Sequence, residues 1–386
     1  NKVIRPCILW NDSRSAQQCI EMEKKYSKLR KITGNIAMPG FTAPKILWIK
    51  QNEKENFKKI HKVLLPKDYL RLRLSNSYYT DMSDASGTLW LDVKKRIWSE
   101  KMLNLTYLTK DNMPTLVEGS DATDYVDKKI SNMLGFSNKV IIAGGAGDQA
   151  AGAAGSGVIN RNQSVISLGT SGVYFSPTKK FVSNTNDAVH SFCHCIPNTW
   201  HHMSVMLSAT NCLDWISKIM NLKVEDCFRR FEKLSTRDLY KKSLPFFLPY
   251  LTGERTPHNN PFLRGSFHKL DTSVEVEEIF YSVIEGVTFG IKDGFEAVHS
   301  VSAKSKEIFV VGGGSKSKLW AKIIASTINK EVLIGEDANL GPALGAARLA
   351  MLASQNYSYN EVFKRMKIVK KCSINNELSK NINERY

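Results

Sequence analysis

The sequence predicts an α/β protein in which two domains flank a cleft. The chain has 386 residues, which is too long for one ordinary hydrophobic core, and 42% of its residues are hydrophobic. From residue 307 onward, short apolar runs alternate with amphipathic segments in the order strand, helix, strand, helix. Strands that alternate with helices favour a mostly parallel or mixed sheet covered by helices.

The first part of the chain is predicted to be mixed α/β with a helical insert. Apolar runs, turn residues and helical spacing of apolar side chains define its elements. In order, the expected elements are a strand that ends at Trp10, a polar turn over 11–13, a helix from about Ser15, a Gly/Pro-rich turn leading into a helix around 46–49, a helix or strand over 64–74, a polar loop over 80–92 that ends in an apolar segment, and amphipathic helices over 98–108 and 124–134.

The stretch from Val140 to Phe175 carries the strongest functional signal. A short β-rich run and three glycines precede Asp148, which stands where a helix should begin. Some twenty residues later, the turn Gly169–Gly172 joins two apolar strands. Its backbone N–H groups and the hydroxyls of Thr170 and Ser171 can cradle phosphate oxygens. An acid that faces a phosphate cradle suggests phosphoryl transfer.

Both features also have plain structural interpretations. Asp148 could be a helix N-cap, because an aspartate before a small-residue helix accepts a backbone N–H in any protein. The turn Gly169–Gly172 could be an ordinary hairpin. It is not a serine-hydrolase elbow, since G-x-S-x-G needs one more residue and a helix after the serine, whereas strand residues follow Gly172.

The second part of the chain is predicted to be more regular. Its expected elements are strand and turn over 181–200, a helix over 206–220, a loop over 249–267, a long helix over 274–299, a strand over 307–311, a glycine turn over 312–314, a helix over 318–329, a strand over 331–334, a small-residue helix over 341–353, and a final helix with a frayed end after Lys364.

The glycine turn at Gly312–Gly314 joins a strand to a helix, where a nucleotide phosphate or ribose is commonly held. Close packing alone also explains many such turns. The turn does not have the G-x-G-x-x-G spacing, and no acid follows the next strand where a dinucleotide site would need one. A nucleotide other than a dinucleotide therefore fits better.

Charge and cysteine content exclude several classes of protein. The formal charge is +17, but the 54 Lys and Arg residues are scattered, which favours a solvated basic surface over a nucleic-acid partner. A basic nucleic-acid binder is kept as a hypothesis that depends on charge alone. The seven cysteines are widely spaced and odd in number, which is typical of reduced thiols. No apolar run is long enough to cross a membrane, and the first residues lack a signal peptide, so a cytoplasmic protein with no membrane partner is expected.

A group of histidines and cysteines between residues 190 and 202 could suggest a metal site. The spacing of these residues matches no common zinc pattern, and two of the cysteines are two positions apart in a predicted strand. Core packing is therefore expected, and no protein ligand to a metal is assigned. The residues are His190, Cys193, His194, Cys195, His201 and His202.

Nearly the whole chain resembles one family, the FGGY carbohydrate kinases. The segments that carry the resemblance are RPCILWNDSR, TGNIAMPGFTAPKILW, KVLLPKDYLRLRL, TDMSDASGTLWLDV, GDQAAGAAGSG, SLGTSGVYF, VHSFCH, PYLTGERTPHNNP, VGGGSKSKLW and GPALGAARLA, in the family's order. The resemblance implies two ribonuclease H-like domains of the actin-like ATPase superfold. It also implies ATP-dependent phosphorylation of a sugar, with D-xylulose as the expected substrate and D-xylulose 5-phosphate as the product.

The resemblance implies different functions for different parts of the chain. Residues 1–157 would be the remainder of the sugar-binding domain, residues 158–360 the ATP-binding domain, and residues 361–386 a C-terminal helix and tail. The implied cofactors are ATP and Mg²⁺, and a homodimer is the expected assembly.

The resemblance also implies roles for single residues. Asp148 would be the general base for the sugar 5-hydroxyl, and Gln149 a ligand of a sugar hydroxyl. The other residues expected at the sugar are Gly40, Asp12 and Arg14. The residues expected to hold ATP are Gly169, Thr170, Ser171 and Gly172 at its phosphates, and Gly313, Gly314 and Ser317 along its adenosine.

The sequence departs from the family at its start. Complete members begin with a D-x-G-T turn and carry a later Met-His-Gly segment. Neither is present in this sequence ahead of the segment RPCILWNDSR. The first domain is therefore expected to be truncated at its N-terminal side. A kinase for another sugar or polyol, and an inactive remnant that binds sugar or nucleotide, are the alternatives.

Overall fold

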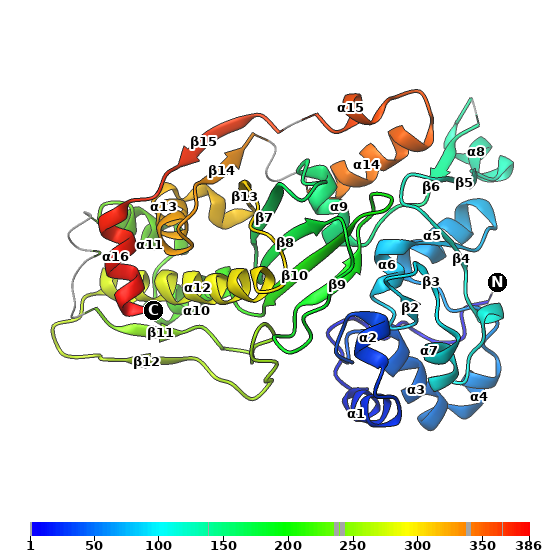
Figure 1. Cartoon of the computed structure of the whole chain (residues 1–386), viewed down its shortest axis with the longest axis horizontal. Helices are drawn as coiled ribbons and strands as arrows, with labels where there is room; N and C mark the ends of the chain where they lie inside the picture. The colour runs from blue at the N-terminus through cyan, green and yellow to red at the C-terminus, as the bar shows by residue number, and fades with distance from the viewer. Residues whose placement is uncertain (1, 138, 235–238, 240–243, 337–340, 365) are drawn as a thin grey trace.

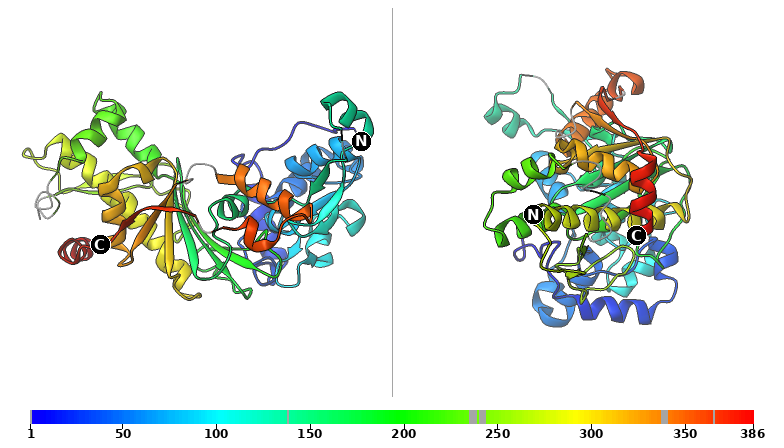
Figure 2. Two further views of the ribbon diagram at one scale, coloured as in Figure 1. Left: turned by 90° about the horizontal axis from the view of Figure 1, so that it is seen from above. Right: turned by 90° about the vertical axis from the view of Figure 1, so that its left-hand side faces the viewer.

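A computed structural model describes residues 2–137, 139–234, 239, 244–336, 341–364 and 366–386. The N-terminal part (residues 2–155) and the C-terminal part (residues 163–386) lie side by side along the long axis of the molecule (Figures 1 and 2). Among the described residues, no helix combines the length and the apolar character that crossing a membrane requires.

The N-terminal part consists of short helices and small two-stranded sheets, which pair β1 with β4, β2 with β3, and β5 with β6. Its elements are α1 (Ala16–Lys25), α2 (Leu29–Thr33), α3 (Thr42–Asn52), α4 (Lys54–Lys58), α5 (Pro66–Ser75), β1 (Tyr79–Asp81), α6 (Met82–Ser86), β2 (Leu91–Asp92), β3 (Ile97–Trp98), α7 (Glu100–Leu105), the 3₁₀ turn η1 (Lys110–Asn112), β4 (Thr115–Val117), β5 (Ala122–Tyr125), α8 (Lys128–Leu134), β6 (Ile141–Ala143) and α9 (Asp148–Gly155).

The C-terminal part is built on one seven-stranded mixed sheet. Its elements are β7 (Gln163–Leu168), β8 (Gly172–Thr178), β9 (His190–Cys193), β10 (Trp200–Met206), α10 (Thr210–Ile219), α11 (Val224–Phe231), β11 (Phe246–Leu248), β12 (Ser266–His268), α12 (Val276–His299), β13 (Glu307–Val311), the 3₁₀ turn η3 (Gly313–Lys316), α13 (Lys318–Thr327), β14 (Val332–Gly335), α14 (Gly341–Ala353), α15 (Tyr359–Val362), β15 (Ile368–Cys372) and α16 (Asn376–Arg385).

The strand order of the large sheet is β15-β14-β13-β7-β8-β10-β9. The central strand β7 pairs in parallel with β13 and antiparallel with β8, so the sheet is mixed as the sequence predicts. Because β7 and β13 are parallel neighbours, their C-terminal ends lie at the same edge of the sheet, and the residues that follow both strands gather there.

Side chains of the sheet alternate between two apolar layers, as the pleat of a strand requires. Ile166 and Tyr174 face the layer formed with helices α10, α12 and α13. Val165 and Phe175, each one position away, face the opposite layer, which includes Ala153 of α9. The sheet is therefore covered by helices on one face, and on the other it faces α9.

Helices α9 and α14 pack closely through small residues, and Figure 1 shows them side by side between the two parts. A Cβ atom added to Gly345 would lie 1.8 Å from the carbonyl oxygen of Ala151, and one added to Gly155 would lie 2.2 Å from that of Gly341. Arg348 Nη1 donates hydrogen bonds to the carbonyls of Ala154 and Gly155, at 2.8 and 2.9 Å. The glycines thus let two helix backbones come into contact.

Most of the predicted helices and strands are present, but several predictions were wrong. Residues 2–10 form no strand, because they pair with none of the described strands, and Val3 and Trp10 are 55% and 73% exposed. The predicted loop over 80–92 instead contains β1 and helix α6, because the Asp81 carboxylate accepts hydrogen bonds from the N–H groups of Ser83 and Asp84 and caps the helix.

Two predicted helices are shorter, because strands occupy their first residues. Residues 122–125 are β5, which pairs with β6, and α8 begins only at Lys128. Residues 200–206 are β10, which pairs with β8 and β9 in the large sheet.

The predicted frayed end is also wrong. Residues 368–372 form β15, which pairs with β14 at the sheet edge. The final helix α16 was predicted, and it buries Leu378 and Ile382. Its Arg385 forms an ion pair with Glu285 at 2.6 Å, so packing and charge both hold the end of the chain.

Candidate functional site

A cavity of about 400 Å³ is lined by residues of both parts of the chain. Three of its lining residues carry charge at neutral pH in their ordinary state, namely Asp84, Asp148 and Arg255. The full lining is Trp10, Met38, Gly40, Phe41, Ser83, Asp84, Gly87, Gly147, Asp148, Gln149, Ala150, Ser171, Val173, His190, Phe192, His201, Met203, Val205 and Arg255.

Asp148 lies in this cavity as the first residue of α9, and its side chain is exposed. The interpretation of Asp148 as the N-cap is wrong, because Gly147 occupies the cap position and no side chain caps this helix. The Asp148 carboxylate accepts the N–H of Gln149 at 2.7 Å. Its second oxygen accepts a long hydrogen bond, 3.5 Å, from the side-chain amide of Gln149. A carboxylate in the first turn is also stabilised by the positive end of the helix dipole.

The glycine loop before Asp148 is fixed by side chains of α5 and α6. Arg71 donates to the carbonyl oxygens of Ala143, at 2.9 Å, and Gly144. The N–H of Gly147 donates to Ser83 Oγ at 2.9 Å. The Ser83 hydroxyl donates in turn to the buried carboxylate of Asp81. These bonds hold the loop before Asp148 against α5 and α6.

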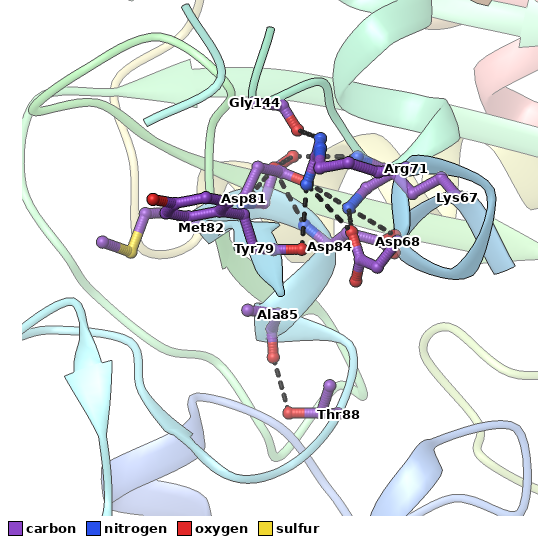
Figure 3. Close-up of polar contacts among 12 residues, drawn as sticks. Lys67, Asp68, Arg71, Tyr79, Asp81, Met82, Asp84, Ala85, Thr88 and Gly144 are labelled. Carbon is purple, nitrogen blue, oxygen red and sulfur yellow. Dashed lines mark hydrogen bonds and ion pairs between the residues drawn. The ribbon is translucent and has the colours of Figure 1, made fainter. Parts of the chain in front are cut away.

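Beneath this loop, Lys67 forms ion pairs with three carboxylates (Figure 3). Its Nζ lies 2.6 Å from Asp68, 2.9 Å from Asp81 and 3.3 Å from Asp84. Burial lowers the pKa of Lys67, but the three carboxylates raise it by more, so the ammonium group stays charged.

Asp84 is the member of this cluster that reaches the cavity, where 29% of its side chain is exposed. Burial raises the pKa of Asp84 to about 7, and the charges of Asp81 and Asp68 raise it as well, while Lys67 opposes them. Asp84 therefore holds a proton near neutral pH, because it is largely buried and because the three carboxylates outnumber the two cations of the cluster, Lys67 and Arg71.

This proton predicts a pH dependence of stability. Folded Asp84 keeps its proton up to about pH 7, whereas its ordinary pKa is 3.8, so between these values the folded state binds more protons than the unfolded state. We expect the free energy of unfolding to fall as pH rises through this window, and Asp84→Asn to remove that part of the slope. Urea unfolding at a series of pH values measures it, with Asp111→Asn, an exposed acid, as control. An Asp84→Asn protein with the wild-type slope would contradict the assignment of this proton to Asp84.

The turn Gly169–Gly172 joins β7 to β8 as predicted, and α10 supports it from below. The N–H and hydroxyl of Thr210 donate to the carbonyl of Gly169 at 3.0 and 2.8 Å, and the N–H of Ala209 donates to that of Thr170 at 2.9 Å. With its carbonyl groups held, the turn leaves Thr170 and Ser171 exposed, and Ser171 lines the cavity.

The second glycine turn lies against the first. Gly312 has φ +88°, and a Cβ atom there would lie 2.7 Å from the carbonyl oxygen of Leu168, the last residue of β7. Gly313 has open space around it, whereas Gly314 packs against Trp320. Ser317 caps α13 by accepting the N–H of Trp320 at 3.1 Å, and its hydroxyl donates to Glu232. The parallel pairing of β7 and β13 thus places both turns at one sheet edge.

The structure brings some of the predicted site residues together and separates others. Gly40, Asp148, Gln149 and Ser171 share the cavity lining. Asp12 and Arg14 are outside it; they form an ion pair with each other at 2.7 Å, and hydrogen bonding from Arg14 lowers the pKa of Asp12 to about 2. The remaining predicted ATP residues lie in or directly after the two glycine turns and not in the cavity lining: Gly169, Thr170, Gly172, Gly313, Gly314 and Ser317.

Sequence reasoning missed Asp84, Arg255 and the cavity position of His190. The core packing predicted for the histidine and cysteine group is confirmed, because all six of its residues are buried. Burial did not exclude His190 from a site, since a side chain can be covered by protein on most sides and still line a cavity. Asp84 and Arg255 lie in two of the segments that carry the family resemblance, TDMSDASGTLWLDV and PYLTGERTPHNNP, but nothing local marks them as neighbours of Asp148.

Comparison with known proteins bears on both parts of the chain. Residues 1–155 match the N-terminal domain, and residues 164–354 the C-terminal domain, of the FGGY family of carbohydrate kinases. The xylulose kinase of Escherichia coli K12 is 46% identical over 354 residues, which are 92% of this chain and 72% of the relative. That of Staphylococcus xylosus is 34% identical over 362 residues, which are 93% of this chain and 74% of the relative.

A solved structure shows the same fold. A crystal structure from Brucella ovis, described as a "xyloylose kinase", superposes with a TM-score of 0.95 at 41% identity and covers 99% of this chain and 78% of its own. The xylulose kinase structure from Lactobacillus acidophilus, at 21% identity and a TM-score of 0.89, supports the fold alone. The predicted two-domain, ribonuclease H-like fold is thereby confirmed.

Proposed function

We propose, because the chain belongs to the FGGY family of carbohydrate kinases, that it transfers the γ-phosphoryl group of ATP to D-xylulose and forms D-xylulose 5-phosphate. The carbohydrate kinase activity follows from the family. The choice of D-xylulose is supported by the relatives reported above, since those in E. coli and S. xylosus are xylulose kinases. We further propose that residues 1–157 bind the sugar and residues 158–360 bind ATP.

One observation carries the mechanism: Asp148 and Ser171 line the same cavity. Asp148 is an exposed carboxylate, which can accept a proton, and Ser171 belongs to a turn suited to phosphate oxygens. A sugar hydroxyl beside Asp148 would therefore face the terminal phosphate of ATP held at the turn.

The proposed reaction is a direct in-line displacement. The 5-hydroxyl oxygen of the sugar attacks the γ-phosphorus, its proton passes to Asp148, and the bond from that phosphorus to the bridging oxygen of ADP breaks. Gln149 and Gly40, which share the lining, would hold the sugar hydroxyls. Proton acceptance of this kind contributes about 10²–10⁴-fold to a rate, and positioning and electrostatics contribute the rest.

ATP would be held by the two adjacent glycine turns at the sheet edge. The exposed hydroxyls at Thr170 and Ser171 and the open space around Gly313 fit a phosphate chain and a nucleoside. Magnesium, which neutralises phosphate charge when bound, would arrive on the ATP phosphates. The three carboxylates at Lys67 surround its ammonium group, and in the described part of the chain no group of three acid, histidine or cysteine side chains has the arrangement of a metal site. We assign magnesium no protein ligand.

A kinase assay across a panel of sugars tests this function. ADP release is measured with ATP and D-xylulose, and then with ribulose, fuculose, gluconate and glycerol at matched concentrations. D-xylulose is expected to give the highest kcat/KM. A higher value for another member of the panel would refute D-xylulose as the substrate but retain the kinase activity. ADP release that no sugar increases would refute both the substrate and the kinase activity.

A further inference from the structure

Arg255 brings a positive charge into the cavity that holds Asp148 and Ser171. It belongs to the segment PYLTGERTPHNNP, to which the proposed function gives no role. Burial lowers the pKa of Arg255, and the charge of Glu254 raises it, but a guanidinium stays protonated at neutral pH. Arg255 is only partly exposed, and a cation that is partly removed from water is stabilised by partners, because burying an unpaired charge is costly.

The protein supplies Arg255 with few such partners. Among the described residues, no carboxylate lies within ion-pairing distance of the guanidinium, and its one hydrogen bond is to His190 Nε2 at 3.2 Å. The neighbouring Glu254 is turned to the backbone, where its Oε1 accepts the N–H groups of Leu207 at 2.9 Å and of Arg255 itself at 2.7 Å. Four of the five N–H groups of the guanidinium are therefore left for a ligand or water.

His190 is held so that it can only accept a hydrogen bond from Arg255. The amide nitrogen of Asn35 donates to the carbonyls of Thr33, at 2.7 Å, and Ser191, at 3.1 Å, so Asn35 Oδ1 faces His190 Nδ1 at 2.9 Å. The proton of the imidazole is thus on Nδ1, and the lone pair of Nε2 points at Arg255. Burial, and then the charge of Arg255, lower the pKa of His190 to about 3, so the ring is neutral.

The other charged groups of the cavity do not neutralise Arg255. Asp84 keeps its proton up to about pH 7 and lies 3.3 Å from Lys67, and the Asp148 carboxylate is beyond ion-pairing distance of Arg255. Apolar side chains, among them Phe192 and Met203, line the cavity beside Arg255, which strengthens any charge interaction there. The site therefore favours an anion, and arginine is well suited to phosphoryl oxygens because its fork can bind two of them.

We propose that Arg255 binds the phosphoryl group as it passes from ATP to the sugar, and afterwards the phosphate of the product, and that Asn35 and His190 position its guanidinium. This role depends on the phosphoryl transfer proposed above and adds a cationic ligand to it. Arg255 would neutralise charge on the equatorial oxygens of the moving group, while the proton goes to Asp148 and ADP leaves.

Binding measurements that compare a neutral ligand with its phosphorylated form test the role of Arg255. By titration calorimetry on the 386-residue protein, Arg255→Gln should weaken binding of D-xylulose 5-phosphate by about tenfold or more and leave that of D-xylulose unchanged. Arg264→Gln, an exposed arginine of the same loop outside the cavity lining, is the matched control and should change neither affinity.

Two outcomes would overturn the proposal. An equal loss for both ligands would mean that Arg255 binds a sugar hydroxyl or holds the fold, and no loss would mean that it binds neither. If the sugar panel selects another substrate, the proposed function is corrected, and the same comparison with that sugar and its phosphate still decides the role of Arg255.

The positioning of Arg255 by His190 has its own test. His190→Leu removes the acceptor, whereas His190→Gln can restore one, so the leucine variant should lose phosphosugar affinity selectively and the glutamine variant should recover part of it. Combining His190→Leu with Arg255→Gln should cost no more than Arg255→Gln alone, because the histidine acts through the arginine. Additive losses would show that His190 acts independently of Arg255 and would overturn the positioning role.

Discussion

Replacing Asp148 by asparagine is expected to lower the rate of sugar phosphorylation by about 10²–10⁴-fold, because asparagine keeps the shape of the side chain but cannot accept the proton of the sugar hydroxyl. Affinity for ATP should be retained, since the two glycine turns proposed to hold ATP are separate from α9. Steady-state kinetics on D-xylulose, with ATP binding measured by calorimetry, check both parts of this expectation.

The control for this experiment is Asp111→Asn, which changes the same chemical group at an exposed position outside the cavity. Its kcat should equal that of the wild type. If Asp148→Asn kept most of its turnover, Asp148 would not be the base. If it lost ATP binding as well, the defect would be one of folding or assembly.

Replacing Gly345 by alanine is expected to give the largest loss of stability. The added Cβ atom would lie 1.8 Å from the carbonyl oxygen and 2.6 Å from the carbonyl carbon of Ala151, and backbone atoms cannot rotate away. Helices α9 and α14 would have to separate, at a cost of about 3 kcal/mol or more in the free energy of unfolding. Because α9 carries Asp148, the rate of phosphorylation should fall too.

Gly152→Ala is the matched control, since Gly152 lies on α9 itself. A Cβ atom there would lie 3.8 Å from Pro342 Cγ, an ordinary van der Waals contact, and alanine is a better helix former than glycine by about 0.5–1 kcal/mol. The two glycine-to-alanine changes should therefore have opposite signs in a urea unfolding experiment. A Gly345→Ala protein as stable as the wild type would show that the helices are not in such close contact.

Local patterns predicted those elements whose signals are themselves local. The strand over 307–311 and the small-residue helix over 341–353 have the predicted bounds, because apolar runs and helix-forming residues define them without help from neighbours. Strands β10 and β15 were missed, since each is fixed by pairing with strands distant in sequence. Tertiary contacts override weak local preferences in such segments.

The candidate site divides in the same way. Asp148 and the turn Gly169–Gly172 could be found because each has a recognisable motif around it. Arg255 could not, because its relation to Asp148 depends on folding, which brings the loop after β11 to the same cavity as α9. Its partner His190 has the composition of a core residue, and only its hydrogen bonds with Asn35 and Arg255 indicate another role.

Helix α9 has one further consequence for the motion of this molecule. Its start is tied to α6 through the hydrogen bond of Gly147 to Ser83, and its body is packed on α14 of the C-terminal part. A rotation of the two parts about this helix pair would leave atoms near the axis almost still and sweep those far from it through the longest arcs. Asp148, the first residue of α9, would lie close to this axis. Its carboxylate would then stay beside Ser171, which lines the same cavity, while the two parts rotate.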